Sequence, residues 1–173
     1  SPLGTVSATI TGAGDHFVGL YVDYEIDEAS NTFFNEHGAP INTPAAWQTW
    51  EIDDPWNDIY WNFRDSNDVV GSQLDNFNAV PAGMENDVAM ALGWDLTLGV
   101  GESSTITFIA SIIAPSSGFF LEHHDPDSDA SIYFSSSVTG GPVGVPEPTT
   151  ILLVGIGLIG LIGLGRRKFR KQS

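Results

Sequence analysis

Three aspartates at alternate positions, Asp125, Asp127 and Asp129, form the pattern in this sequence most typical of metal binding. Carboxylate oxygens spaced in this way can converge on one Ca²⁺ ion, as in the loops of helix–loop–helix calcium proteins. The rest of that loop pattern is missing, because Ala130 and Ser136 stand where a Gly and a bidentate Glu are needed. The residues therefore predict either a Ca²⁺ site completed from elsewhere in the fold or a polar turn, which Asp and Pro favour.

The histidines offer a weaker metal signal. His123 and His124 are adjacent, so on a strand they would point to opposite faces and could not readily share one ion. A shared site would need His16 or His37 beside one of them. The plainer interpretation is that His123 and His124 lie in a solvent-facing loop.

Five large aromatic residues gather in a stretch of 15 residues. On a β-domain, exposed aromatic rings can stack on sugar rings, but large aromatic side chains more often fill a core. Both interpretations stay open for this set, which comprises Trp47, Trp50, Trp56, Tyr60 and Trp61. The sequence contains no G-x-S-x-G and no H-E-x-x-H pattern, and we expect no enzymatic activity.

Alternation of apolar and polar residues indicates the elements that carry these groups. Residues 17–27, 88–98, 105–113 and 131–138 alternate over their length, which predicts half-buried strands, and shorter strands are expected at 5–11 and 59–63. A glycine-rich turn is predicted at 99–102, and no helical period appears before residue 149. We predict an all-β fold, an antiparallel β-sandwich of jelly-roll or Ig-like type, with a closed barrel as the alternative.

The charge is divided sharply along the chain. Residues 1–145 contain 21 acidic residues and one basic residue, Arg64, for which we expect an ion pair with a neighbouring acid. A body with a net charge of −20 repels nucleic acid and anionic lipid, so neither is expected as a partner. Acidic patches at 53–58 and 65–68 suit Ca²⁺ binding or turn formation.

The last 34 residues have three parts in a fixed order. A glycine-rich linker ends in Pro146, Glu147 and Pro148, an uncharged segment of 17 residues covers 149–165, and a basic cluster follows. Seventeen residues are at the short end for a bilayer span, and the basic cluster predicts a cytoplasmic end. The expected anchor residues are Ile151, Leu152, Leu153, Val154, Leu158, Ile159, Leu161, Ile162 and Leu164, and the basic stop is Arg166, Arg167, Lys168, Arg170 and Lys171.

This order of motif, short Gly-rich apolar segment and terminal basic cluster resembles the PEP-CTERM sorting domain over residues 145–171. The resemblance implies that an exosortase reads Pro146, Glu147 and Pro148 and cleaves there. It also implies a Gram-negative bacterium that produces exopolysaccharide. Residues 91–108 resemble a hairpin of PEP-CTERM ectodomains, and residues 125–136 resemble their closing strand.

The expected organisation follows from these parts. It comprises an acidic β-sandwich ectodomain at 1–139, a linker at 140–148, a transmembrane helix at 149–165 and a basic cytoplasmic tail at 166–173. We expect an exported protein, held briefly at the inner membrane with its body outside the cytoplasm and then placed at the cell surface or in the extracellular matrix. Its expected role is structural or adhesive, and the alternative is a module that binds Ca²⁺ or polysaccharide. Residues 1–10 lack the features of a signal peptide, which we expect to be removed or omitted.

Overall fold

The computed structural model describes residues 2–26, 32–65 and 73–141. Within these residues, eight strands form two antiparallel sheets. The five-stranded sheet has the order β1 (Pro2–Thr11), β6 (Ser103–Ser111), β8 (Ala130–Gly140), β7 (Phe120–Asp125), β3 (His37–Ile41). The three-stranded sheet has the order β2 (Gly14–Asp23), β5 (Ala89–Leu98), β4 (Gln48–Asp53).

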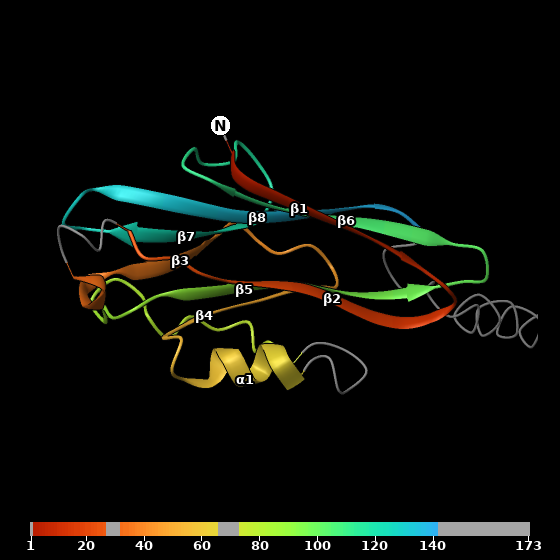
Figure 1. Cartoon of the computed structure of the whole chain (residues 1–173), viewed down its shortest axis with the longest axis horizontal. Coiled ribbons are helices and arrows are strands. Elements are labelled where there is room, and N and C mark those ends of the chain that lie inside the picture. The colour runs from red at the N-terminus through yellow and green to blue at the C-terminus, as the bar shows by residue number, and fades with distance from the viewer. Residues whose placement is uncertain (1, 27–31, 66–72, 142–173) are drawn as a thin grey trace, which may run out of the picture. The chain divides into compact units, whose positions relative to one another are not determined.

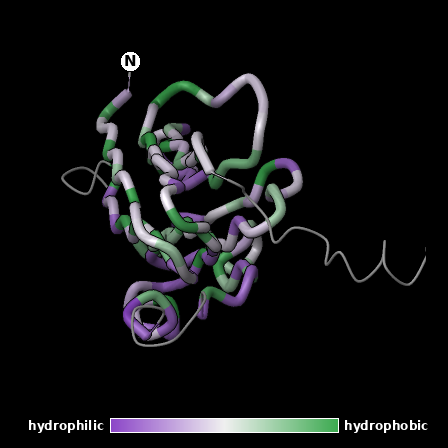
Figure 2. Tube along the Cα trace, turned by 90° about the vertical axis from the view of Figure 1, so that its right-hand side faces the viewer, coloured by the Kyte–Doolittle hydropathy of each residue, from purple (hydrophilic) through white to green (hydrophobic). Residues whose placement is uncertain are grey.

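The two sheets lie face to face with the main core between them (Figure 1). Side chains from both sheets fill this core, including Leu92 and Trp94 of β5, Phe108 of β6 and Phe134 of β8. Hydrophobic and hydrophilic residues alternate along much of the chain trace in Figure 2, as expected for strands with one buried face. The predicted antiparallel β-sandwich is confirmed.

β5 is the central strand of the smaller sheet and is buried on both sides. Its even-numbered side chains, from Met90 to Leu96, belong to the core between the sheets. Its odd-numbered residues Ala89 and Ala91 face a second apolar cluster on the opposite side of the sheet. Each face of β5 therefore buries its own set of side chains, as the alternation of residues 88–98 predicts.

The second cluster is covered by a short helix, α1 (Asp58–Asp65), and a strand at 59–63 was the wrong prediction. Ile59 and Phe63 are four residues apart, a spacing that places both on one face of a helix. Ile59 is fully buried, and the Phe63 ring lies 6.0 Å from that of Tyr21 on β2. Ile59 and Phe63 cover the apolar face of the sheet from one side of this helix. Residues 59–63 do not join the sheet as another strand. A short 3₁₀ helix, η1 (Phe33–Asn35), precedes β3.

The predicted turn at 99–102 joins two strands that do not pair with each other. β5 pairs with β2 and β4, whereas β6 pairs with β1 and β8. The Glu102 carboxylate accepts a hydrogen bond from the Gly99 N–H at 2.6 Å, and Gly101 has a φ of 82°. The segment is a corner between the sheets, so the hairpin expected from the resemblance of residues 91–108 is wrong. The strands β7 and β8 do form a hairpin.

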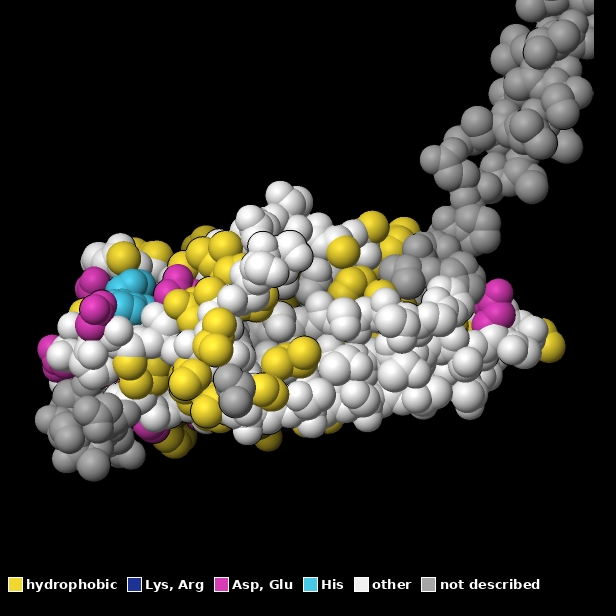
Figure 3. Space-filling view, turned by 90° about the horizontal axis from the view of Figure 1, so that it is seen from above, with side chains coloured by type: hydrophobic (Ala, Val, Ile, Leu, Met, Phe, Trp, Pro, Cys, Tyr) yellow, Lys and Arg dark blue, Asp and Glu magenta, His cyan; other side chains and the backbone are white. Residues whose placement is uncertain are grey.

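The outer face of the five-stranded sheet carries rows of hydroxyl groups. Ser7 and Thr107 are joined by a 2.9 Å hydrogen bond between their hydroxyls, and Thr9 and Thr105 by another of 2.9 Å. The three neighbouring strands β1, β6 and β8 contain no charged residue. Figure 3 views this side, where acidic side chains gather toward the ends and the middle is mainly uncharged.

The chain divides into two compact units, Ser1–Val143 and Gly144–Ser173. The predicted transmembrane helix, the sorting motif Pro146–Pro148 and the basic tail all lie outside the described residues. Within 2–26, 32–65 and 73–141, no helix has the length and apolar character needed to cross a membrane. β8 extends to Gly140, one residue into the predicted linker.

Candidate functional site

A cleft of about 650 Å³ opens on the side of the small sheet that α1 covers. This volume lies within the range of about 300–1,000 Å³ typical of ligand sites. Its walls come from the end of β2, the segments that follow β2 and β4, helix α1 and the residue preceding Val88. The lining residues are three carboxylates and a set of mainly aromatic side chains: Tyr21, Asp23, Glu25, Phe33, Pro55, Trp56, Tyr60, Trp61 and Asp87.

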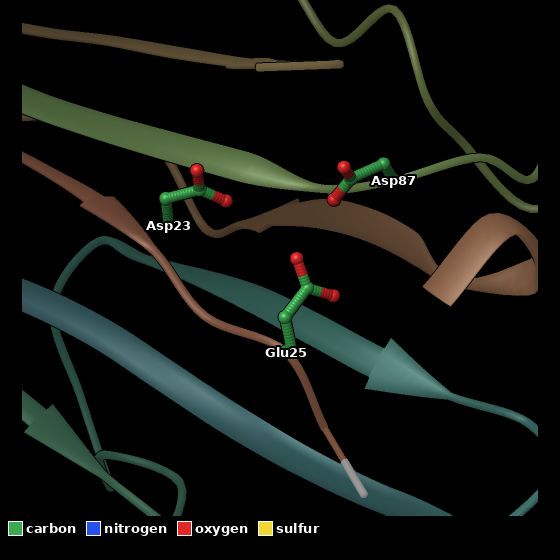
Figure 4. Close-up of side chains that lie close together, drawn as sticks. All are labelled: Asp23, Glu25 and Asp87. Carbon is green, nitrogen blue, oxygen red and sulfur yellow. The ribbon is translucent and has the colours of Figure 1, made fainter. Parts of the chain in front are cut away.

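The three carboxylates converge because of the pairing between β2 and β5. Asp23 lies opposite Ala89 in this antiparallel register, and continuing the register brings Glu25 opposite Asp87. Residues two apart on a strand share a face, so all three side chains project to the side of α1. One oxygen from each lies within 4.8 Å of the others, and Figure 4 shows the three carboxylates pointing toward one space.

Asp87 is the most confined member of this carboxylate cluster, which we define as Asp23, Glu25 and Asp87. It is 3% exposed, and its Oδ1 atom is buried without a hydrogen-bond partner in the part of the chain that the structure describes. Burial, with the negative charges of Asp23 and Asp54, raises the pKa of Asp87 from 3.8 to about 6. A hydrogen bond from the Val88 backbone N–H opposes that rise. The cleft therefore holds a carboxylate whose charged neighbours are acidic and whose one hydrogen bond among the described residues leaves Oδ1 unsatisfied.

Asp23 and Tyr21 add to this electrostatic environment. Burial raises the pKa of Asp23, and the opposing influences are His123 and a hydrogen bond with Tyr21. Burial and the neighbouring charges of Asp23 and Asp87 raise the pKa of the Tyr21 hydroxyl, which remains protonated at any ordinary pH. The hydroxyl therefore donates to Asp23, and the cleft keeps its negative character.

The aromatic residues of the cleft are largely accessible to solvent. Trp56 is 89% exposed at the rim, and Tyr60 and Trp61 on α1 are about half exposed, with ring centroids 5.2 Å apart. The Arg64 guanidinium lies 4.1 Å from the centre of the Trp61 ring. Arg64 also pairs with Asp65 at 2.8 Å, which confirms the expected ion pair.

The five aromatic residues of the sequence stretch do not act as one group. Trp50 is 8% exposed and belongs to the main core, as the core interpretation predicts. Trp56, Tyr60 and Trp61 line the cleft, and the ligand-platform interpretation stays an untested prediction for these three. Trp47 is 44% exposed, but it is not among the residues that line the cleft.

The acidic patch at 53–58 builds the turn that carries Trp56. The Asp54 carboxylate accepts hydrogen bonds from the Trp56 N–H at 2.8 Å and from the Asn86 side-chain amide at 2.5 Å. Asp53 accepts from the Asp54 N–H at 2.7 Å. These hydrogen bonds stabilise the turn, and the one from Asn86 links the turn to the residue next to Asp87. The patch at 65–68 lies largely outside the described residues.

The structure places Asp125 at the end of β7 and Asp127 and Asp129 in the turn that leads to β8. Asp125 is fully buried, and its oxygens accept hydrogen bonds from the Asp127 N–H at 2.9 Å and the Ser128 hydroxyl at 2.6 Å. Asp127 and Asp129 are exposed, and the three carboxylates do not form a group with oxygens within 4.8 Å of one another. Asp125 closes the turn, and Ca²⁺ binding there stays an untested prediction.

The histidines are arranged on opposite faces, as predicted for neighbours on a strand. His123 is buried in β7 and its Nε2 atom lies 2.5 Å from the Glu36 carboxylate. His124 faces outward, where its ring lies 4.9 Å from that of His37 and its Nδ1 atom contacts the Ser131 hydroxyl. Since His123 is buried, the interpretation of both histidines as solvent-facing loop residues is wrong.

Two members of the carboxylate cluster could be predicted from the sequence pattern. The alternation of residues 17–27 places Asp23 and Glu25 together on the polar face of a strand. Asp87 stands directly before the second alternating segment, and nothing in the sequence alone pairs that segment with the first. Only the pairing register of β2 and β5 brings Asp87 beside Asp23 and Glu25.

Comparison with known proteins identifies one region. A family model for the PEP-CTERM protein-sorting motif matches residues 144–171, which agrees with the resemblance found in the sequence. No curated protein and no solved structure matches the chain.

Proposed function

Since the chain carries a PEP-CTERM sorting motif, we propose that it is a surface or matrix protein of a Gram-negative bacterium with a structural or adhesive role. The motif at residues 144–171 indicates an exported protein targeted to an exosortase, and this observation carries the proposal. Residues 146–148 form the recognition motif, and cleavage beside them frees the β-domain from a transient anchor in the inner membrane. The acidic, cysteine-free domain then remains at the cell surface or among secreted polysaccharide.

The cleft supports polysaccharide binding as the adhesive activity. Exposed faces of Trp56, Tyr60 and Trp61 offer apolar surfaces of the kind that stack on sugar rings. Asp23 and Glu25 are exposed beside them and can accept hydrogen bonds from sugar hydroxyls. The negative charge of the cleft favours neutral or amino sugars over acidic ones.

We propose binding without catalysis at this cleft. Carboxylates with raised pKa values can act as acids in glycoside hydrolysis. Asp87 has the pKa best suited to that role, but its side chain is almost fully buried and a glycosidic oxygen cannot easily reach it. The absence of new reducing ends after incubation with the bound polysaccharide is the expected result, and their steady release would refute this part of the proposal.

Sorting is tested with the full chain in a host that has a matching exosortase. We expect the chain to lose its C-terminal segment, which mass spectrometry of the secreted product detects, and we expect Glu147→Ala to accumulate uncut in the membrane fraction. A Glu102→Ala variant, altered in the corner between the sheets, is the matched control and should be cut normally. Uncut wild-type protein that persists in the membrane of this host would defeat the proposal.

Sugar binding is tested by co-sedimentation of the full chain, in a detergent without sugar headgroups, with polysaccharide from the same host. Trp56→Ala should weaken binding by more than about fivefold, the loss of roughly 1 kcal/mol or more typical of a central aromatic contact. Trp47→Ala is the control, since Trp47 is exposed outside the cleft lining. Equal binding by both variants would exclude the cleft as the adhesive surface.

A further inference from the structure

We propose that Asp23, Glu25 and Asp87 form a Ca²⁺ site at the inner wall of the cleft. The site differs from the predicted Asp125, Asp127 and Asp129 loop and does not depend on the sorting of the protein. The donors that the described residues offer are carboxylate oxygens, which are the ligands preferred by hard divalent cations. Figure 4 shows the three side chains directed at a common space from three positions of the chain.

The spacing of the donor atoms fits Ca²⁺. Two ligands of one ion can lie no farther apart than twice the metal–oxygen distance, roughly 4.6–5.2 Å for Ca²⁺ and about 4.0–4.2 Å for Mg²⁺. One oxygen from each carboxylate lies within 4.8 Å of the others, so small rotations of the side chains, without movement of the strands, bring all three to Ca–O distances. Ca²⁺ also accepts six to eight irregularly placed oxygens, and water can enter the open side of the cleft to complete its shell.

Asp87 supplies an observation independent of the clustering. Its side chain is almost fully buried and points into the cluster in Figure 4, and its Oδ1 atom has no hydrogen-bond partner among residues 2–26, 32–65 and 73–141. A buried carboxylate oxygen left without a partner is costly, since most buried polar groups in native proteins are satisfied. The charged neighbours that most affect this carboxylate are Asp23, Asp54 and Glu36, all acidic. A bound cation would satisfy the oxygen and offset this repulsion.

The comparison with Asp125 strengthens the assignment. Asp125 is equally buried, but its oxygens accept three hydrogen bonds, from the Asp127 N–H, the Ser128 N–H and the Ser128 hydroxyl. The turn therefore uses Asp125 to satisfy its own backbone. The cleft leaves Asp87 facing two other carboxylates, an arrangement that a cation explains and a turn does not.

The affinity expected is that of an extracellular module. Asp23 and Glu25 are exposed, and only Asp87 is held rigidly by burial. Sites with few fixed carboxylates in extracellular proteins bind Ca²⁺ with a Kd of about 10⁻⁴–10⁻³ M. Such a site would fill outside the cell and remain empty in the cytoplasm.

The proposal is tested with Tb³⁺, a luminescent substitute for Ca²⁺, added to the purified full chain in a polyoxyethylene detergent. Tyr21, Trp56 and Trp61 line the same cleft and can transfer excitation energy to a bound ion. We expect sensitised Tb³⁺ emission that added Ca²⁺ abolishes and that equimolar Mg²⁺ leaves largely intact. Calorimetric titration with Ca²⁺ alone then gives the Kd directly.

Glu25→Gln and Asp87→Asn should each weaken Ca²⁺ binding by at least about tenfold, since even substitutions outside the ligand shell cost about 10–100-fold. Glu25 is exposed, so its variant keeps the test valid should Asp87→Asn fold poorly. Asp127→Asn is the matched control, with one charge removed from the other acidic turn, and should bind like the wild type. Binding that is unchanged in both cleft variants, or lost in Asp127→Asn alone, would overturn the proposal, as would wild-type protein that binds no Ca²⁺ at millimolar concentration.

Discussion

Asp87 should destabilise the fold at neutral pH when no cation is present, and replacing it by Asn should therefore stabilise the protein. Its pKa rises from 3.8 to about 6 on folding, because of burial first and of Asp23, Asp54 and Glu36 next. A carboxyl group with a raised pKa binds its proton more tightly in the folded state than in the unfolded state. The free energy of unfolding therefore falls as the pH rises from about 4 to about 6.

The rise in pKa sets the size of the effect. A difference of about 2 pKa units corresponds to about 3 kcal/mol above pH 6, and relaxation of the site with entry of water reduces this to about 1–3 kcal/mol. Asn has almost the shape of Asp, can accept the same hydrogen bond from the Val88 N–H and can donate to Asp23. Asp87→Asn should raise the free energy of unfolding by this amount at pH 7.5 and leave it nearly unchanged at pH 3.5.

Urea unfolding followed by tryptophan fluorescence, in EDTA, measures the difference at both pH values. Asp127→Asn serves as the control and should stay within about 0.5 kcal/mol of the wild type, because its side chain is exposed in a turn. An Asp87→Asn protein that is less stable than the wild type at pH 7.5, or a gap of equal size at both pH values, would refute the reasoning. Saturating Ca²⁺ should reduce the difference in free energy of unfolding between Asp87→Asn and the wild type at pH 7.5. Only the wild type keeps all three carboxylates, so Ca²⁺ should stabilise it more than the variant.

Two further substitutions test the packing and the second buried acid. Gly93→Ala would place a methyl group 2.4 Å from the Phe17 ring and should lower stability by about 1–3 kcal/mol, whereas Gly4→Ala, with no atom within 4 Å, should change thermal unfolding little. Burial raises the pKa of Glu51 from 4.5 to about 7, against hydrogen bonds from Asn62. Glu51→Gln should therefore have a higher free energy of unfolding than the wild type above pH 7, but not below pH 4.5. A lower free energy of unfolding for the variant at pH 8, measured by urea unfolding, would contradict this prediction.

The long strands were predictable because one face of each is apolar. Residues 88–98 alternate so regularly that the division of β5 between two clusters follows from the sequence. The strands β4 and β7 were missed because they bury polar residues, Glu51 and Asp53 in β4 and His123 in β7, whose types suggest a loop. Their burial depends on partners outside these strands, Glu36 for His123 and Asn62 for Glu51, which local alternation does not reveal.

Only the part of the candidate site that depends on local sequence patterns could be predicted. Local patterns identify Asp23 and Glu25 as neighbours on a polar face and mark residues 47–61 as rich in aromatic side chains. The cleft needs Asp87 as well, and its position follows from the pairing of β2 with β5, which is a long-range choice. The helical form of α1 also depends on the apolar sheet face that it covers, because eight residues are too few to form a stable helix alone.

The hydroxyl-bearing strands β1, β6 and β8 have a consequence for crowded conditions. Copies of a protein with so many acidic side chains repel one another, and dissolved salt limits that repulsion to about 8–10 Å. The repulsion is weakest over the surface of these three strands, which carry no charged residue. At the densities of a secreted gel, neighbouring copies would therefore approach most closely through this face, and the protein would behave as a particle with one neutral side.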